Sequence, residues 1–531
     1  MDAWKIEEKY KKIIKKETAL YEIKKNADLS AVLIYPNTYY VGMSNLGFQT
    51  VFSIINSSPN FNCERAFLPD SKDEQIYKQG TQKYYSMESA RLISDFDMVI
   101  FSVSYEVDYL NVLKMLHYSG IPLKSEERDE KHPIIIAGGA AVTLNPQPIS
   151  KFIDLFIIGD GENTVEKMLN VRAESKTKDE FLKNISLMET YYVPKYYSND
   201  KKIIRNCIKK IKNPAHSIFL SPDTEFKNTF LVEATRGCPY KCSFCVVGNC
   251  FNPFRYADIS GMEKIIKYGR RFTDRIGIIS SSVNSYPYIK ELIHILDETG
   301  FKVSFSSLRA DLLDEDLLKL LLKSSQRTLT IAPETISGKL RKIINKNIDE
   351  EDIYNAFDLC IKHNLRNYKL YFMLGLPSED EADIEEMIAF LKKLSSYLYE
   401  RSPVSKIKVS VSKFIPKPFT PLQWERTESE DIYNHKIQII KEALKKINNI
   451  ELNFESGKIA YISSLLSRGD SDIADALCNN FLDFKYRRFF EETKNLDFES
   501  KFNGKYNEIL PWGFLCDKDL KEKLWAKEKN F

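Results

Sequence analysis

Short runs of apolar residues recur in the first third of the chain, and longer segments of mixed polar and apolar residues separate them. These runs stand at residues 31–35, 98–103, 133–137 and 155–158. A continuous apolar run is typical of a strand that is buried on both faces, as in parallel sheets flanked by helices. Alternation of such strands with helical segments predicts an α/β fold, with a doubly wound, Rossmann-like parallel sheet over residues 29–171.

A second series of strand-like runs extends from residue 229 to about residue 447 with a longer spacing. The runs lie at residues 275–280, 302–306, 328–331, 367–372 and 406–411, and polar or glycine residues follow each of them. This period predicts a partial (β/α) barrel, in which chemistry sits at the carboxyl ends of the strands. We expect the remaining segments to be an N-terminal helix (1–28), a connector (172–228) and a mostly helical C-terminal region (448–531).

Composition narrows the class of protein. The chain has 531 residues, of which 43% are hydrophobic and 28% charged, and a formal net charge of +3. No apolar run approaches the length of a membrane span, and the N-terminus does not resemble a signal peptide, so we expect a cytoplasmic protein with reduced cysteines. Basic residues at 201–212 alternate with isoleucines, which favours a charged strand face over a nucleic-acid surface.

Three cysteines directly after a β-type run carry the strongest chemical signal. Cys238, Cys242 and Cys245 have the spacing Cys-x-x-x-Cys-x-x-Cys, with Gly237 and Pro239 providing a tight turn. Thiolates suit iron–sulfur clusters, and three of them leave one iron of a cubane cluster open for another ligand. The alternative is a structural zinc site with Cys250 as the fourth ligand.

The stretch from Glu233 to Cys245, including the aromatic Phe244 before the last cysteine, resembles the cluster loop of radical S-adenosylmethionine (radical SAM) enzymes. This resemblance implies a 4Fe-4S cluster on the three cysteines. SAM would bind the open iron and be cleaved reductively to methionine and a 5′-deoxyadenosyl radical. It also implies a set of SAM contacts: Phe244, Ser280, Ser282, Ser307, Arg309, Glu334, Lys346 and Tyr371.

The implied roles follow from the groups of SAM. Arg309 and Lys346 are cations that could face its carboxylate, and the strand end at Ser280 and Ser282 would accept from its ammonium. Glu334 and Tyr371 stand at positions that usually contact the ribose and the methionine part of SAM. The backbone of Phe244 stands at the position that usually contacts the adenine. For Arg309, Glu334 and Lys346 the alternative is a structural network of salt bridges.

The N-terminal region resembles the cobalamin-binding-type domain that precedes the radical SAM domain in a large subgroup of that family. The matching segments are residues 40–47, 104–106, 120–123, 138–139, 145–148 and 159–162. The resemblance implies cobalamin contacts at Ser104, Gly138, Gly139, Gly159 and Gly161. The chain departs from histidine-ligating cobalamin domains because it lacks their Asp-x-His-x-x-Gly motif. Two alternatives remain open: the domain binds cobalamin without a lower histidine, or it has lost the cofactor.

The C-terminal motifs Arg468-Gly-Asp470 and Leu510-Pro-Trp512 extend the resemblance to an uncharacterised radical SAM group.

Four functions are compatible with these sequence features: cobalamin-dependent methylation of an unactivated carbon or a phosphinate, radical SAM chemistry without cobalamin, a tRNA methylthiotransferase, and a non-catalytic zinc protein. The third needs three further N-terminal cysteines, but only Cys63 precedes residue 200. We expect an electron donor such as flavodoxin or ferredoxin, an unknown substrate and no membrane partner, and no residue stands out as a general base or radical relay.

Overall fold

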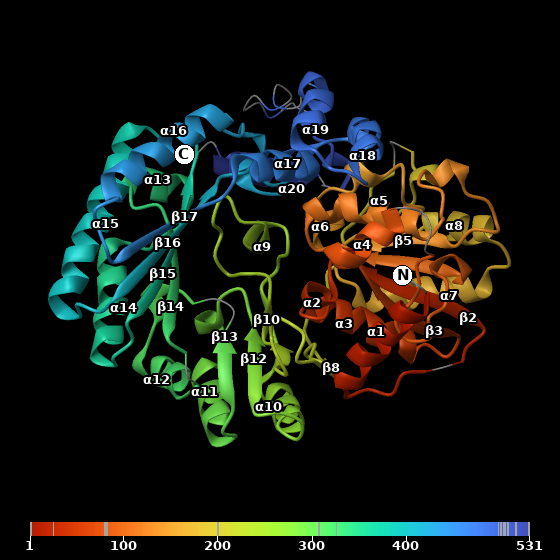
Figure 1. Cartoon of the computed structure of the whole chain (residues 1–531), viewed down its shortest axis with the longest axis horizontal. Helices are drawn as coiled ribbons and strands as arrows, with labels where there is room; N and C mark the ends of the chain where they lie inside the picture. Colours follow the sequence, from red (N-terminus) through yellow and green to blue (C-terminus); the bar gives the residue numbers. More distant parts are fainter. Residues whose placement is uncertain are drawn as a thin grey trace.

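The fold is described from a computed structural model over residues 3–24, 26–78, 83–198, 201–305, 308–324, 326–496, 499, 502, 506, 509–515 and 518–528. Two α/β bodies stand side by side, and helices near the C-terminus lie across both of them (Figure 1). Among the described residues, no helix combines the length and apolar character that crossing a membrane requires.

The N-terminal body contains a six-stranded sheet with the order β3-β2-β4-β5-β6-β7. Its strands are β2 (Leu29–Tyr35), β3 (Phe61–Phe67), β4 (Met98–Ser102), β5 (Ile134–Gly138), β6 (Leu155–Ile157) and β7 (Tyr191–Tyr192). All neighbours are parallel except β6 and β7. The predicted doubly wound parallel sheet is thus confirmed.

Alternate residues of the apolar runs enter two different cores, one on each face of this sheet. Val32 and Ile34 of β2 belong to one core, while Ala31 and Leu33 belong to the other. The second core also contains side chains of α3 (Leu46–Ser57), α7 (Glu162–Glu174) and α8 (Lys178–Ser186). Burial of both faces explains why the strands read as continuous apolar runs.

Strand β3 lies outside the apolar runs that predicted the sheet. Its sequence, Phe-Asn-Cys-Glu-Arg-Ala-Phe, contains two charged residues. Arg65 is almost fully buried, and it pairs with Glu17 at 2.7 Å and with Glu88 at 2.6 Å. The strand therefore tolerates a buried cation because two carboxylates from other segments neutralise it.

The chain reaches this body through α1 (Ala3–Lys16) and β1 (Thr18–Ala19), and β1 pairs with β8 (Phe219–Leu220) of the connector. Smaller helices of the N-terminal body are α2 (Tyr39–Gly42), α4 (Ser71–Lys78), α5 (Tyr109–Tyr118) and α6 (Ala140–Leu144). Asn45 caps α3 by accepting from the amide of Phe48 at 2.9 Å.

The second body contains seven parallel strands in two sheets, so the described strands do not close into one barrel. The first sheet has the order β13-β12-β9 and the second the order β14-β15-β16-β17. Their bounds are β9 (Phe230–Glu233), β12 (Arg275–Ile279), β13 (Lys302–Phe305), β14 (Thr328–Glu334), β15 (Asn367–Leu374), β16 (Lys406–Lys413) and β17 (Ile450–Phe454). The sheet thus continues beyond residue 447.

Helices cover one face of the two sheets (Figure 1). They are α10 (Ile259–Gly269), α11 (Ile289–Glu298), α12 (Glu315–Lys323), α13 (Gly338–Ile343), α14 (Glu350–Lys362), α15 (Glu381–Arg401) and α16 (Glu430–Leu444). Residues on the opposite face of β15, such as Lys369, Tyr371 and Met373, are partly or fully exposed, whereas their neighbours in sequence are buried. The inner face of the partial barrel is therefore open.

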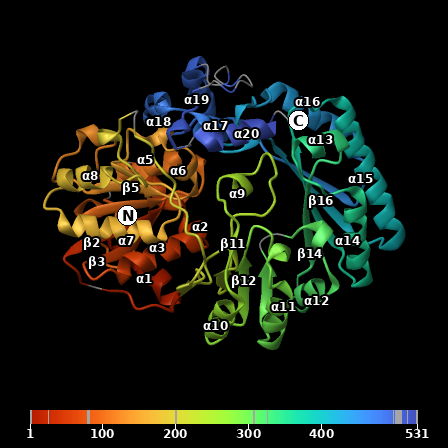
Figure 2. The same ribbon diagram turned by 180° about the vertical axis from the view of Figure 1, so that it is seen from behind.

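The C-terminal region contains α17 (Gly457–Arg468), α18 (Ala474–Asn480), α19 (Tyr486–Thr493) and α20 (Lys518–Glu528), and both views place α17 and α20 between the tops of the two bodies (Figures 1 and 2). Leu465 and Leu477 enter a core of the N-terminal body. Lys417, which follows β16, lies 2.5 Å from Glu106 of the N-terminal body. The region therefore joins the two bodies.

Arg468, the first residue of the Arg-Gly-Asp step, is fully buried. Its guanidinium donates to the carbonyl oxygen of Glu425 at 2.6 Å and lies 3.6 Å from the ring centroid of Phe502. Gly469 ends α17, so the step is a helix-ending turn with a structural arginine.

Gly139 should be more sensitive to substitution than Gly120, although both glycines have a positive φ. Its φ is +112°, and an added Cβ would lie 2.5 Å from the carbonyl oxygen of Val103. We expect Gly139→Ala to destabilise the N-terminal body by about 2–4 kcal/mol, through backbone strain and a clash. Gly120→Ala is the matched control, because Gly120 has φ +69° but no heavy atom within 4 Å of the added Cβ. Equal thermal unfolding midpoints for the two variants would contradict this reading.

Candidate cofactor sites

The three predicted ligand cysteines lie in a loop whose ends are paired. Strand β10 (Thr235–Arg236) precedes the loop, β11 (Arg255–Tyr256) follows it, and the two strands are antiparallel. Gly237 begins the loop with φ +75°, where a Cβ would lie 2.5 Å from the carbonyl oxygen of Phe251. The loop thus leaves β10 through a turn that requires glycine.

Side-chain amides fix the backbone of the cysteine loop. Asn249, in α9 (Val246–Asn249), donates to the carbonyl oxygens of Cys242 and Cys245, both at 2.8 Å. Asn345 donates to the carbonyl oxygen of Lys241 at 2.9 Å. Loop conformation is therefore set by groups within the loop and by the segment after α13.

The three cysteines are neighbours in a partly buried loop. Burial raises the pKa of Cys242 to about 11, with Lys346 opposing the shift, and burial also raises the pKa of Cys245. Each of the two thiols interacts electrostatically with Cys238, so the three are neighbours. Nevertheless, no three His, Cys, Asp or Glu side chains among the described residues are arranged to hold one metal ion. A cubane cluster needs no such convergence because each thiolate binds its own iron.

Cys250 occupies a different environment from the other three. It is fully buried, and the Nη1 atom of Arg205 lies 2.9 Å from its sulfur. The zinc alternative requires this thiol as a fourth ligand, whereas its polar partner is a connector arginine. The geometry therefore fits a three-cysteine cluster and offers no support for the zinc site.

Two of the predicted SAM contacts form an ion pair at the end of β14. Lys346 lies 2.9 Å from Glu334 and 6.0 Å from the ring centroid of Phe244. Burial raises the pKa of Glu334, and the neighbouring lysine partly offsets that effect. Glu334 has φ +71°, a strained conformation of the kind that clusters at functional sites.

A second group joins the ends of β12 and β13 to the cysteine loop. The Arg309 guanidinium lies 3.8 Å from the ring centroid of Tyr240 and makes two bonds of 2.9 Å to Asp311. Ser285 contacts both the hydroxyl of Tyr240, at 3.3 Å, and that of Ser282, at 2.9 Å. Ser282 and Arg309 are thus connected through the loop.

The remaining predicted SAM contacts are less directly connected. The hydroxyl oxygens of Ser280 and Thr235 are 2.6 Å apart in a hydrogen bond, next to the cysteine loop. Tyr371 is on the open face of β15, where the ammonium of Lys369 lies 4.5 Å from its ring centroid. Ser307 lies outside the described residues.

A cavity of about 470 Å³ lies between the strand ends of the N-terminal body and those of β9 and β12. All five predicted cobalamin contacts line it: Ser104, Gly138, Gly139, Gly159 and Gly161. Leu231, Glu233, Arg236 and Ile279 contribute from the second body. Its volume is in the usual range for cofactor pockets.

The cavity wall contains hydroxyl, amide and carboxylate groups but, among the described lining residues, neither imidazole nor thiol. Such a wall fits cobalamin, whose macrocycle carries neutral amide side chains, and it offers no lower histidine. His117 lies in the last turn of α5, with its ring centroid 5.4 Å from that of Phe481. Cobalamin binding without a lower histidine stays a prediction.

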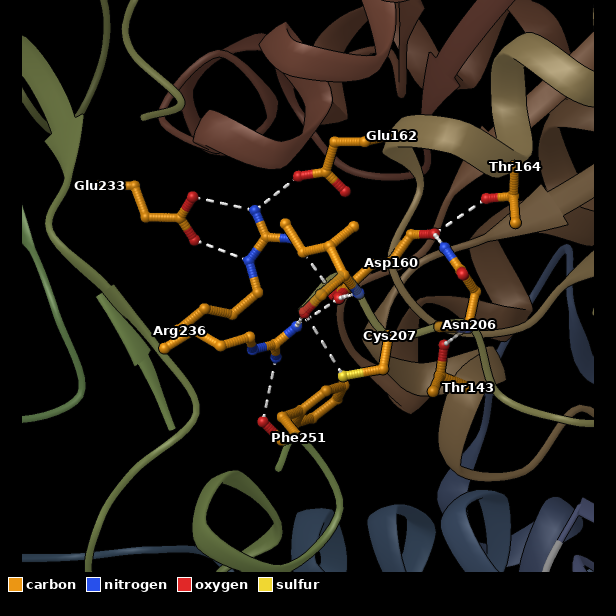
Figure 3. A network of polar contacts seen from close by, with 12 residues as sticks. Thr143, Asp160, Glu162, Thr164, Asn206, Cys207, Glu233, Arg236 and Phe251 are labelled. Atoms are coloured by element: carbon orange, nitrogen blue, oxygen red, sulfur yellow. Dashed lines mark hydrogen bonds and ion pairs between the residues drawn. The ribbon is translucent and has the colours of Figure 1, made fainter. Parts of the chain in front are cut away.

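Four charged side chains of the cavity lining form one network around Arg236, at the start of the cysteine loop (Figure 3). Arg236 pairs with Glu233 at 2.8 Å, Glu162 at 2.7 Å and Asp160 at 3.1 Å. The sequence analysis did not assign Arg236, Asp160 or Tyr240 to a site. Two sequence features could have indicated Arg236 and Tyr240: the Arg-Gly-Cys step, and the position of the tyrosine between the first two cysteines.

Two family models match the chain. "Radical SAM proteins, N-terminal" matches residues 47–194, and "Radical SAM superfamily" matches residues 232–391. An uncharacterized protein of Methanocaldococcus jannaschii is 31% identical over 84% of this chain and 90% of its own length. An uncharacterized methyltransferase of Pyrococcus horikoshii is 22% identical, over 49% of this chain and 58% of its own.

Among solved structures, the cobalamin-dependent SAM radical enzyme OxsB with aqua-cobalamin and SAM bound matches with a TM-score of 0.50. It is 12% identical, and the match covers 94% of this chain and 71% of OxsB. This likeness supports the arrangement of a Rossmann-like body beside a partial barrel.

Substitution of the cysteines should separate the cluster from the zinc alternative. We expect Ala at Cys238, Cys242 or Cys245 to abolish the oxygen-sensitive 4Fe-4S absorption of anaerobically reconstituted protein, because each thiolate binds one iron. Cys250→Ala is the matched control and should retain iron and sulfide. Stoichiometric zinc that is lost in Cys250→Ala would overturn the assignment.

Proposed function

Because the chain belongs to the radical SAM superfamily, we propose that it is a cobalamin-dependent radical SAM methyltransferase acting on an unactivated carbon or a phosphinate. Members of this superfamily use SAM, a 4Fe-4S cluster and a reductant. For this chain we propose flavodoxin or ferredoxin as the reductant and the cytoplasm as the compartment.

One observation carries the cobalamin part of the proposal. The five residues that sequence motifs assign to cobalamin line one cavity, and that cavity also touches β9 and Arg236 at the start of the cysteine loop. Bound there, cobalamin would supply methyl-carrier chemistry. The cavity and the loop would then bring the two cofactor regions together at facing strand ends.

The protein's own groups would orient SAM. Lys346 uses one ammonium proton on Glu334 and retains others for a carboxylate. The Arg309 guanidinium lies over the ring of Tyr240 and makes two bonds to Asp311, so its direction is fixed. Ser280 and Ser282 are both buried at the end of β12 and add hydroxyl and carbonyl groups. Holding a zwitterion at several points fixes the geometry of the bond to be broken.

The inner face of the second sheet is where a substrate would approach. Tyr371 is 36% exposed on that face. Exposed polar side chains on this face would let a molecule approach from solvent without disturbing the N-terminal body. The substrate region we propose is therefore the space bounded by β14–β17 and the cysteine loop.

The methylthiotransferase alternative lacks its ligands. Cys63, the sole cysteine before residue 200, is fully buried in β3, where its backbone amide is bonded to the side chain of Asn56. A second cluster of the methylthiotransferase type would need two more thiols in this body, and the sequence has none.

Two side chains should contribute measurably to SAM binding. We expect Glu334→Gln and Arg309→Met each to weaken SAM binding by about 1–3 kcal/mol, the usual scale of a charge-assisted contact. Equilibrium binding and dithionite-driven release of 5′-deoxyadenosine would measure the effect. Glu451→Gln is the control, since Glu451 on β17 forms an exposed ion pair with Lys408 of β16. Wild-type binding by both site variants would assign the residues to a structural network.

Cobalamin should bind without a protein imidazole. We expect electron paramagnetic resonance of the cobalt(II) form to show no splitting of each line into three by a coordinated nitrogen, and His117→Ala to leave the spectrum unchanged. A three-line splitting that changes to a two-line splitting when the protein's histidines carry nitrogen-15 would exclude histidine-free binding. Protein that rejects cobalamin yet cleaves SAM would instead support radical chemistry without cobalamin.

A further inference from the structure

The neck of the cysteine loop brings two arginines together. In the antiparallel pair of β10 and β11, Arg236 lies directly opposite Arg255. Both side chains are largely buried, with 20% and 3% of their surface exposed. Like charges directly opposite each other destabilise a strand pair, and burial weakens the screening by water. This neck therefore needs an anion to remain closed.

Asp160 supplies that anion from the N-terminal body. One carboxylate oxygen lies 3.1 Å from Nη1 of Arg236, and the other lies 2.5 Å from Nη1 of Arg255. The second oxygen also accepts from the backbone amide of Ile208 at 2.9 Å. A single carboxylate thus bridges the two strands that close the loop.

Other carboxylates do not duplicate this bridge. Glu162 and Glu233 both pair with Arg236, as Figure 3 shows, and among the described residues neither forms an ion pair with Arg255. Arg255 has Asp160 as its ion-pair partner, and its other polar contacts are to the carbonyl oxygens of Phe251, Pro253 and Ile208. Removing Asp160 would leave Arg255 facing Arg236 without their shared counterion.

Asp160 is also part of the cavity rim. It stands between Gly159 and Gly161, and all three line the cavity. The connector holds this turn in place, because Asn206 donates to the carbonyl oxygen of Asp160 at 2.6 Å and accepts from its amide at 2.9 Å. A molecule in the cavity therefore touches the same turn that closes the cysteine loop.

We propose that Asp160 is a positioning residue that couples the cavity to the cysteine loop through Arg236 and Arg255. It holds the neck of the loop closed, and a cavity occupant restrains the turn that carries it. The conformation of the loop, and so the environment of a cluster on its cysteines, depends on the cavity. The coupling rests on the proposed function, whereas the closing of the neck depends only on the contacts above.

The test compares wild type, Asp160→Asn and the control Asp274→Asn as full-length, anaerobically reconstituted proteins. Asparagine keeps the shape of Asp160 and removes its charge. Asp274 is about half exposed and pairs with Lys302 near the amino ends of β12 and β13, away from the neck. Three quantities are measured: hydrogen–deuterium exchange of residues 237–256, the reduction potential of the cluster, and the change in both when hydroxocobalamin is added.

In Asp160→Asn we expect exchange of the loop amides to be about tenfold faster or more, the scale set by loss of charge-assisted bonds. The cluster potential should move away from the wild-type value, and thermal unfolding should match Asp274→Asn. Hydroxocobalamin should slow exchange and shift the potential in wild type but not in Asp160→Asn. If Asp160→Asn does not fold, Arg236→Gln breaks the link between Asp160 and β10 instead. Because it also removes the like charge opposite Arg255, its expected effect is loss of the response of exchange and potential to hydroxocobalamin, without faster exchange in the free protein.

Wild-type exchange and potential in Asp160→Asn would overturn the positioning role, whatever binds in the cavity. Cobalamin that binds wild type without changing the loop or the potential would overturn the coupling. Failure of cobalamin to remain bound after gel filtration, seen from its own absorbance, would instead remove the cobalamin part of the proposed function. The exchange and potential of Asp160→Asn without cobalamin would then still decide whether Asp160 closes the neck.

Discussion

The closed neck of the cysteine loop is the constraint on which the arrangement of both candidate sites depends. Pairing of β10 with β11 brings the ends of a long loop together, so the cysteines stay above the strand ends of the second body. Loop closure costs conformational entropy, and here the strand pair supplies few backbone bonds to offset it. The charges around Arg236, Arg255 and Asp160 therefore matter more than they would in a wide sheet.

The parallel sheets of the two bodies differ in how many of their faces are covered by helices. Helices cover both faces of the N-terminal sheet, whereas the sheet of β14–β17 keeps one face open beside the loop. Open faces are uncommon for parallel sheets because they usually carry apolar side chains. On β15 the open face carries the exposed Asn367 and Tyr371 and the partly buried Lys369 and Met373, so polar groups predominate there and the face remains compatible with water.

The sequence could predict the architecture because apolar runs and their polar ends are local signals. It placed β2, β4, β5 and β6, and its fold class is confirmed. Strand β3 could not be predicted in the same way, since the burial of Arg65 depends on Glu17 and Glu88, which are distant in sequence. The division of the second body into two sheets depends on strand pairing, which a run of apolar residues does not specify.

The candidate site shows the same limit. Spacing identified the three cysteines, and motif resemblance selected five residues that the fold brings to one cavity. The roles of Tyr240 and Asp160 depend on contacts with Arg309 and Arg255, which no local pattern contains. The individual SAM contacts remain predictions, because ion pairs such as that of Glu334 with Lys346 occur in binding sites and in structural networks alike.

The C-terminal helices have a kinetic meaning as well as a structural one. Their side chains enter the core of the N-terminal body, and Lys417 reaches Glu106 from the segment after β16. Groups bound at the strand ends of the N-terminal body and at those of the second body would consequently have a high effective concentration relative to each other. The translational and rotational entropy of their encounter is already lost when the chain folds. Loosening the C-terminal region would slow any transfer between these two sets of strand ends without removing a single group that touches the reactants.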